Sequence, residues 1–134
     1  MKRIFLPVFL LMFFAMSGCT ENAQRLPVQT WENFIVTIET RPPTVREGMN
    51  EFLIIVNEQL ENGRKRVAND LIVTLQIKGQ ATQHQGIQDG HVGVYRRAIN
   101  VIDPATDVLI VQIEHGEEIG YLEFHLRDQK KKGQ

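Results

Sequence analysis

Apolar and polar residues alternate along most of the chain after residue 30, and no segment shows the period of a helix. The clearest case is Leu71–Lys78, in which all odd-numbered residues are apolar and three of the four even-numbered ones are polar. Successive side chains of a strand point to opposite faces, so this pattern gives the strand one apolar face that can join a core. The sequence therefore predicts an all-β domain.

Six segments carry this pattern and are predicted to be strands. They span residues 34–38, 52–56, 71–77, 92–101, 109–113 and 122–126. Pro42-Pro43, Asn62-Gly63 and Asp103-Pro104 mark turns between them, because Pro cannot donate to a central ladder and Asn-Gly favours a tight turn. The polar, Gly- and Gln-rich stretch Gly79–Gly90 is predicted to be a loop. Short strands separated by Gly and Pro turns favour an immunoglobulin-like β-sandwich of about seven strands.

The register of the last two strands follows from the turn between them. In His115–Glu118, Gly116 occupies the first central position of a two-residue loop, which suits a type II′ turn. His115 is then opposite Glu118, and the apolar residues of both segments fall on one face, as a single-sided core requires. The predicted pairs are Ile113 with Gly120, Val111 with Leu122 and Leu109 with Phe124.

The start of the chain carries the marks of an export signal. Lys2 and Arg3 precede Ile4–Met16, which is almost entirely apolar. A charged start, a short apolar stretch and small residues before a cleavage site are typical of a secretory signal peptide. The stretch is shorter than the roughly 20 apolar residues that a membrane-spanning helix needs. Ser17-Gly18-Cys19 resembles the lipobox of bacterial lipoproteins, which implies cleavage after Gly18 and acylation of Cys19.

These observations divide the chain into four parts. They are a lipoprotein signal peptide (1–18), a flexible tether (19–30), a β-sandwich domain (31–127) and a disordered basic tail (128–134). The tether is predicted to be flexible because it is polar and shows no apolar period. The alternative is an ordinary secreted protein whose single Cys lies near the cleavage site. Thr20 follows Cys19 where lipoproteins of the inner membrane carry Asp, so the resemblance implies an outer-membrane anchor facing the periplasm.

The composition after the predicted cleavage site excludes several classes of function. Residues 19–134 carry 13 basic and 16 acidic side chains, a formal charge of −3, whereas nucleic-acid-binding domains are normally basic. No Ser follows Ser17, and an acylated Cys19 has no free thiol, so Ser-His-Asp and Cys-His nucleophilic sites are ruled out. No two carboxylates have a spacing that forces them together. The sequence therefore predicts that the protein is not an enzyme.

Three segments resemble the FixH-like and YtkA-like bacterial domains. They are Gly48–Phe52, Asn62–Ala68, and Gly93–Arg96 followed by the strand at Leu109–Val111. The resemblance covers Trp31–Arg127 and implies an extracytoplasmic, immunoglobulin-like sandwich. Some members of this family are associated with copper handling or with assembly of respiratory oxidases. Their loop after the third strand is often rich in Met and His, whereas Gly79–Gly90 here contains His84 and no Met.

His84 and His91 are the candidate metal ligands. They flank a loop and approach each other if that loop folds back, and imidazole is a common ligand of copper and zinc. The alternative is two solvated loop histidines, because Met49 is the only Met after the predicted cleavage site and soft ligands are scarce. In the predicted register, more than about 20 Å separates His115 from His125, so these two cannot share a metal ion.

Tyr95 and two basic clusters are the other candidate site residues. Tyr95 follows Gly93 at the start of a predicted strand, a pattern similar to the tyrosine corner, in which the hydroxyl bonds a nearby backbone group. We expect it to be structural, with ligand binding as the alternative. The clusters are candidate docking surfaces for anionic lipid headgroups or an acidic partner, or else solvated charges. They consist of Arg64, Lys65 and Arg66 in a predicted turn and of Arg96 and Arg97 in a predicted strand.

The sequence thus favours a lipid-anchored protein of the cell envelope that acts as a non-catalytic binding or assembly module. Its expected partners are the membrane, through the lipid on Cys19, and a protein of the envelope, without nucleic acid. No cofactor is expected beyond the covalent lipid, with copper or zinc as an alternative. Two other functions stay open: a periplasmic copper- or metal-handling protein of the FixH/YtkA type, and a structural accessory of an envelope complex.

Overall fold

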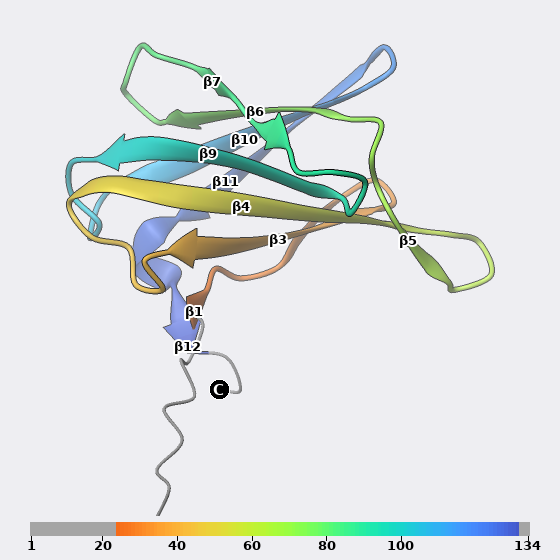
Figure 1. Ribbon diagram of the computed structural model, residues 1–134, viewed down its shortest axis with the longest axis horizontal. Helices are drawn as coiled ribbons and strands as arrows, with labels where there is room; N and C mark the ends of the chain where they lie inside the picture. The colour runs from red at the N-terminus through yellow and green to blue at the C-terminus, as the bar shows by residue number, and fades with distance from the viewer. Residues whose placement is uncertain (1–23, 132–134) are drawn as a thin grey trace, which may run out of the picture.

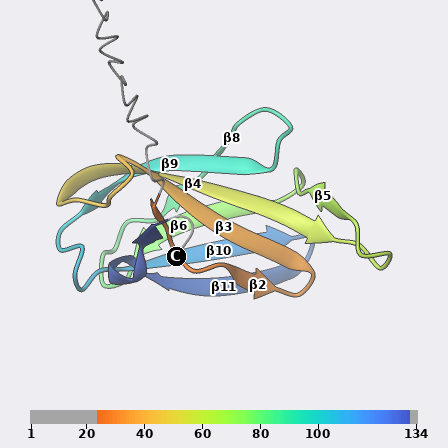
Figure 2. The same ribbon diagram turned by 90° about the horizontal axis from the view of Figure 1, so that it is seen from below.

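The computed structural model describes residues 24–131 and is all-β. Twelve strands and one 3₁₀ turn, η1 (Leu126–Asp128), form two antiparallel sheets stacked face to face, consistent with a β-sandwich (Figures 1 and 2). Within this range no helix is long and apolar enough to pass through a bilayer. The prediction of an all-β, sandwich-like domain is confirmed.

The larger sheet contains eight strands. Its continuous path is β12–β1–β3–β4–β9–β8, with β2 beside β3 and β5 beside β4. The bounds are β1 (Gln24–Arg25), β2 (Gln29–Trp31), β3 (Phe34–Arg41), β4 (Gly48–Gln59), β5 (Lys65–Val67), β8 (Ile87–Gln88), β9 (Val94–Val101) and β12 (Lys130–Lys131). All of β3 pairs with β4, and β4 also pairs with β9, so these three strands form the centre of the sheet.

The smaller sheet contains four strands in the order β11–β10–β6–β7. The bounds are β6 (Ile72–Ile77), β7 (His84–Gln85), β10 (Val108–His115) and β11 (Glu118–His125). The chain passes from this sheet to the larger one at Gly86, because β7 pairs with β6 and β8 pairs with β9. The N–H of Gly86 donates to the carbonyl of Val73 at 2.7 Å, which fixes the crossing point.

The six long strands correspond to the six segments predicted from alternation: β3, β4, β6, β9, β10 and β11. The register of the last hairpin is also confirmed, with His115 opposite Glu118 and Ile113 opposite Gly120. Gly116 has a φ of 62°, and no other residue of this loop has a positive φ, as a type II′ turn requires. Gly120 has a second role, because a Cβ at this position would overlap the indole ring of Trp31.

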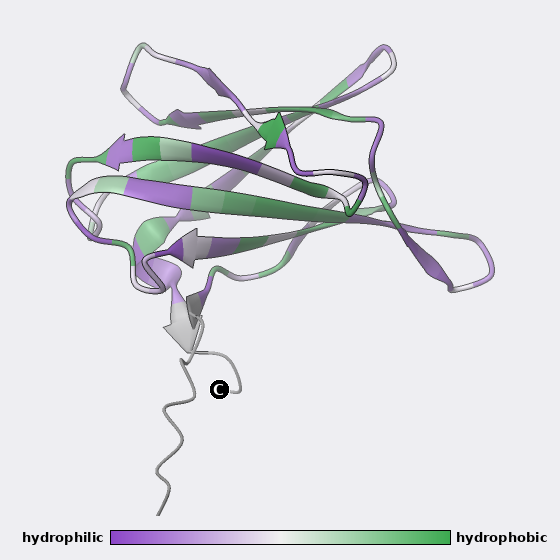
Figure 3. Ribbon diagram, in the orientation of Figure 1, coloured by the Kyte–Doolittle hydropathy of each residue, from purple (hydrophilic) through white to green (hydrophobic). Residues whose placement is uncertain are grey.

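The core lies between the two sheets. Each long strand buries alternate residues, as in β3, where Phe34, Val36 and Ile38 are at most 2% exposed and the residues between them are partly exposed. Figure 3 shows hydrophobic stretches along the strands and polar residues at most turns. Removal of this apolar surface from water is the main force that holds the sheets together.

The domain begins earlier than the sequence predicts. Residues 24–30, assigned above to a flexible tether, form β1 and the first part of β2, and Leu26 is 1% exposed within the core. Leu26 has no apolar neighbours at strand spacing, so alternation does not reveal it. Arg25 pairs with Glu39 of β3, and their side chains form an ion pair of 2.5 Å.

The domain also ends later than predicted. Residues 128–131, assigned above to a disordered tail, complete η1 and form β12, which pairs with β1. The Gln129 side chain accepts from the N–H of Val45 at 2.9 Å and donates to the Thr40 hydroxyl at 2.7 Å, which ties this segment to the β3–β4 loop. Residues 1–23, which include Cys19, and residues 132–134 lie outside the described residues.

The predicted loop Gly79–Gly90 contains β7 and β8, and the predicted turn after β4 contains β5. These strands have two or three residues each, which is too short to establish an alternating pattern in the sequence. Their backbone pairing, not their side-chain pattern, makes them strands.

Candidate functional site

A pocket of about 340 Å³ lies at the end of the sandwich where β3 begins and β10 ends. Its walls come from segments far apart in the chain: β3, β4, β5, the β5–β6 connection, the turn before β9 and the last residue of β10. The lining residues are Phe34, Glu58, Arg66, Val67, Ala68, Asn69, Asp70, Leu71, His91 and His115. Both charge signs and two imidazoles therefore border one cavity.

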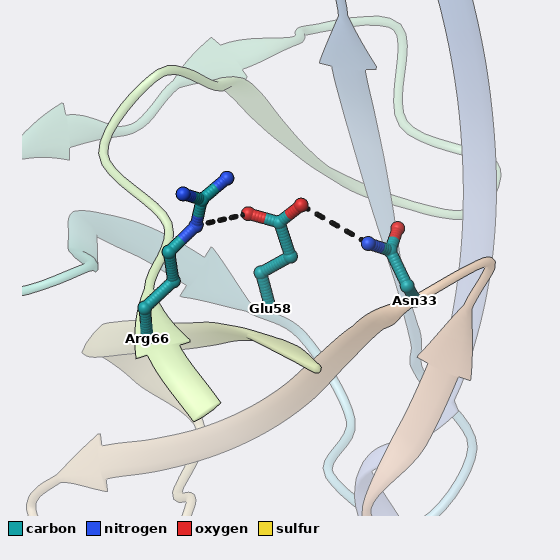
Figure 4. A network of polar contacts seen from close by, with 3 residues as sticks. All are labelled: Asn33, Glu58 and Arg66. Carbon is teal, nitrogen blue, oxygen red and sulfur yellow. Dashed lines mark hydrogen bonds and ion pairs between the residues drawn. The ribbon is translucent and has the colours of Figure 1, made fainter. Parts of the chain in front are cut away.

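Glu58 and Arg66 form a charged pair on one wall (Figure 4). The Nε of Arg66 donates to Glu58 Oε2 at 2.7 Å, and Asn33 Nδ2 donates to Oε1 at 3.0 Å. The hydrogen bond from Arg66 lowers the pKa of Glu58 below its ordinary value of 4.5, against the opposing effect of burial. Glu58 is therefore an anion at neutral pH. This hydrogen bond uses the Nε of Arg66, and the side chain is 63% exposed, so its terminal nitrogen atoms can donate to another group.

The β5–β6 connection forms a second wall, and Tyr95 holds it in place. Tyr95 is 1% exposed, and its hydroxyl donates to the Ala68 carbonyl at 2.7 Å and accepts from the Leu71 N–H at 3.3 Å. Burial raises the pKa of this phenol, so it stays protonated and able to donate. The hydroxyl thus bonds both ends of residues 68–71, and those backbone groups lie 24 and 27 residues before it, not in the adjoining turn.

Asn69 joins the same wall to the turn that carries His91. Its side chain accepts from the Gly93 N–H at 2.9 Å and donates to the His91 carbonyl at 3.2 Å. Gly93 has a φ of 71°, and a Cβ at this position would lie 2.7 Å from the Val56 carbonyl oxygen. Only glycine fits this close approach of the turn to β4. Asn69 and Gly93 therefore hold the turn that carries His91 against the pocket.

Aromatic side chains form the base of the pocket. Phe34 is 2% exposed and stacks on Trp31 with ring centroids 5.8 Å apart. His115 meets Phe34 edge to face at 5.1 Å, so its imidazole is held by packing while it borders the cavity. Next to it, Glu118 hydrogen-bonds Glu32 from the facing turn, and this contact raises the pKa of Glu32 above its ordinary value.

The pocket suits the binding of a small polar group. Its volume is near the lower end of the range of about 300–1,000 Å³ that is typical of ligand sites. It offers guanidinium donors, carboxylate acceptors and imidazoles that act as either. In the part of the chain that the structure describes, no three His, Cys, Asp or Glu side chains are grouped so as to hold a metal ion.

The two candidate metal ligands lie in different surroundings. His84 belongs to β7, where it pairs with Leu75 of β6, and it does not line the pocket. His91 lines the pocket, and the histidine that joins it there is His115.

The two basic clusters do not form one surface. Arg66 pairs with Glu58 near the end of β4, whereas Arg96 pairs with Leu53, five residues earlier on the same strand, or roughly 17 Å away. Arg64 and Lys65 are exposed beside Arg66. Arg96 and Arg97 border a separate, open depression with Glu51, Ile87 and Ala98, and Arg96 lies 3.7 Å from Asp89.

Sequence reasoning missed most of the pocket. From the sequence, Phe34 is an ordinary strand residue and His115 a turn residue. Nothing in the sequence around Glu58 or Asn33 indicates that they lie at a pocket. The carboxylates of Glu32 and Glu118 meet because two turns from different sheets lie side by side. The predicted hairpin register locates His115 and Glu118 at a turn, but nothing in the sequence shows which turn faces it.

Comparison with known proteins found no matching family model, no matching curated protein and no matching solved structure. No family is assigned to the chain on these grounds. The similarity to FixH-like and YtkA-like domains stays a prediction based on the short segments quoted above.

Replacing Tyr95 with Phe tests its structural role. The substitution leaves the Ala68 carbonyl and the Leu71 N–H without their buried partner, so we expect a loss of about 1–3 kcal/mol in the free energy of unfolding. Urea denaturation followed by the fluorescence of Trp31, the single tryptophan, measures it. Tyr121→Phe is the matched control, because that phenol is 64% exposed. Equal stabilities of the two variants would contradict the structural assignment.

Proposed function

We propose that the protein is a lipid-anchored lipoprotein of the bacterial cell envelope and acts as a non-catalytic binding or assembly module. The observation that carries the proposal is Cys19, which follows Ser17-Gly18 at the end of the apolar stretch. Two or more acyl chains on this residue hold a protein stably at a membrane, whereas one chain holds it only marginally. Only four residues separate Cys19 from β1, so the anchored unit is the sandwich itself.

The finer fold and location follow from the same proposal. The sandwich is of the immunoglobulin-like type, similar to the FixH-like and YtkA-like domains, and the lipid is held in the outer membrane with the sandwich in the periplasm. Two antiparallel sheets stacked face to face support this type. Thr20, in place of Asp, supports the outer membrane.

The recognition site in this proposal is the pocket at the end of the sandwich. It is the described cavity in which an arginine, carboxylates and imidazoles converge over an aromatic base. Arg66 supplies the cationic contact, and its exposed guanidinium favours an anionic group of an envelope protein, such as a carboxylate. Recognition of this kind needs no reaction step, in keeping with a chain that has no Ser after Ser17.

The anchor is tested by mass spectrometry of the protein from a bacterial host. We expect an N-terminal peptide that begins at Cys19 and carries diacylglycerol, and we expect the protein in the membrane fraction. Cys19→Ala removes the acylated thiol, so that variant moves to the soluble fraction or keeps its leader. Thr20→Ala is the matched control and stays lipidated. A wild-type protein with an intact leader, or trimmed without fatty acid, would refute the proposal.

The recognition site is tested by crosslinking in membranes with charge reversals at two residues of one basic cluster, Arg64 and Arg66. Arg66→Glu removes the guanidinium from the pocket and repels Glu58, so we expect at least a tenfold loss of the crosslinked partner. Arg64→Glu makes the same charge change outside the pocket and should keep it. Circular dichroism shows that both variants fold. Equal losses, or recovery of only self-crosslinked protein from the wild type, would rule out this site.

Metal handling of the FixH/YtkA type is the second candidate function, and the shared position of His91 and His115 at the pocket favours it. It predicts stoichiometric copper or zinc binding that is lost in the His91→Ala/His115→Ala variant. Both candidate pairs contain His91, so the single variants distinguish them: His115→Ala should lose the metal if it binds at the pocket, and His84→Ala should lose it if it binds the pair expected from the sequence. Isothermal titration of the folded proteins measures this, and a wild type that takes up no metal would end this candidate.

A further inference from the structure

An open stretch of sheet edge lies along β9. In the larger sheet β9 lies between β4 and β8, and β8 pairs with it only at Tyr95 and Arg96 (Figure 2). The chain turns away from this edge at Gly86, whose N–H donates to the Val73 carbonyl of the other sheet. No strand of the described chain therefore pairs with residues 97–101 on the side away from β4.

The backbone of Ala98 faces this open edge. In an antiparallel ladder the N–H and C=O groups of one residue point to the same side, and successive residues alternate. Just beyond β8, the Asp89 N–H donates to the Val94 carbonyl at 2.8 Å. Further along the edge, Gln80 Nε2 donates to the Asn100 carbonyl at 3.4 Å. Ala98 is an even number of residues from both of these acceptors, so its N–H and C=O point to the same side.

The side chains of Arg96 and Arg97 approach the edge from opposite faces of the sheet. Neighbouring strand residues point to opposite faces, and Arg97 is opposite the buried Phe52, on the core side. Both arginines nevertheless border one open depression of about 520 Å³, together with Ala98 and Ile87, which is 60% exposed. The two arginine side chains therefore flank the open backbone.

The two guanidinium groups are available to a ligand. Within the described residues, the Arg97 side chain forms no hydrogen bond or ion pair. Arg96 lies 3.7 Å from Asp89, and the two side chains are 43% and 47% exposed, so this pair is weak. Glu51 also borders the depression, and Arg41 lies 3.9 Å from it. Three arginines against two carboxylates leave a net charge of +1, which favours an anionic ligand.

We propose that this edge binds an extended acidic segment of a partner protein, which adds a strand to the larger sheet beside β9. Peptides that join a sheet edge gain affinity from backbone hydrogen bonds and specificity from side chains that alternate between the two faces. The added residue opposite Ala98 shares the outer face with Arg96, and the next one, opposite Arg97, shares the core-side face. Two successive acidic residues therefore meet one arginine each, and an apolar neighbour packs on Ile87.

A second copy of this chain does not suit the edge. Pairing two β9 strands about Ala98 would bring Arg96 and Arg97 of both copies together, and like charges at a sheet edge oppose such pairing. An acidic segment of another protein has the complementary charge.

This surface is separate from the pocket. Arg96 and Arg66 lie roughly 17 Å apart along β4. The inference therefore goes beyond the recognition site proposed above and depends neither on that pocket nor on the lipid. Its failure would leave both of those proposals unchanged.

Binding of synthetic peptides to the full-length protein tests the proposal. The protein is purified in mild detergent as a bacterial host produces it, and fluorescence anisotropy measures binding of fluorescein-labelled Thr-Val-Glu-Glu-Val-Thr. We expect this peptide to bind about tenfold or more tightly than its Gln-Gln counterpart, with the difference reduced at high salt. The same peptide methylated at both Glu nitrogens cannot donate to the edge and should not bind. Equal affinities of the three peptides, or no binding of the first, would overturn the proposal.

Variants of the protein locate the contact. Ala98→Pro removes a backbone N–H that faces the edge and keeps the ladder with β4, so we expect a loss of about tenfold, whereas Ala98→Val keeps the N–H and should bind like the wild type. Arg96→Gln/Arg97→Gln should lose the preference for the Glu-Glu peptide. Arg64→Gln/Lys65→Gln removes the same charge elsewhere and should keep it.

Circular dichroism shows which of these variants fold. If Ala98→Pro does not fold, the methylated peptide tests the same backbone contact on the wild type. Wild-type affinity of a folded Ala98→Pro, or equal losses in the two charge variants, would contradict a strand added at this edge.

Anionic lipid is the other ligand that two arginines can hold. Soluble dihexanoyl phosphatidylglycerol is therefore titrated against the wild type and the Arg96→Gln/Arg97→Gln variant. We expect it to leave the bound peptide in place. Binding of this lipid that depends on the two arginines, without binding of the peptide, would assign them to the membrane and overturn the proposal.

Discussion

The crossing between the two sheets depends on the buried hydroxyl of Tyr95. The chain leaves the larger sheet at β5 and enters the smaller sheet at β6, and the four residues between them bond this hydroxyl at both ends. A buried backbone group without a partner costs free energy. Within the crossing segment, the Ala68 N–H donates to the Val56 carbonyl of β4 at 3.0 Å, and the Ala68 carbonyl and the Leu71 N–H bond Tyr95. Tyr95 supplies both a donor and an acceptor from the core. The second wall of the pocket exists because this segment is held against β9.

The two hydrogen bonds of the Tyr95 hydroxyl also explain why the pocket is polar although it adjoins the core. Asn69, Asp70 and the ends of β4 and β5 project where the sheets no longer cover each other. Phe34 belongs to the core and also lines the cavity, so the core and the cavity meet at this ring, and Trp31 stacks on it. Side chains at this boundary are held by packing on the core side and exposed to solvent on the cavity side. This combination favours selective binding, because little side-chain freedom is lost when a ligand arrives.

The sequence predicts the strands well and the pocket poorly, for a physical reason. Alternation and turn chemistry are local, and they locate the six long strands and the full register of the last hairpin. A pocket formed by Phe34, Glu58, His91 and His115 depends on which turn lies over which strand, and no local pattern encodes that. The short strands β1 and β12 are missed for a related reason. Two paired residues carry no period, and their order comes from Leu26 and Gln129, whose neighbours show no pattern.

The edge formed by β1 and β12 links this architecture to the proposed lipid anchor. These are the first and last strands that the structure describes, and they pair with each other, while β1 also pairs with β3 at Glu39. Four residues separate Cys19 from β1 in the sequence, so in the proposed lipoprotein this end of the sandwich is the one tied to the bilayer. Phe34, which lines the pocket, lies five residues before Glu39, or roughly 17 Å along β3. In that arrangement, most of the length of one strand separates the lipid from the pocket at which the proposed partner would be met.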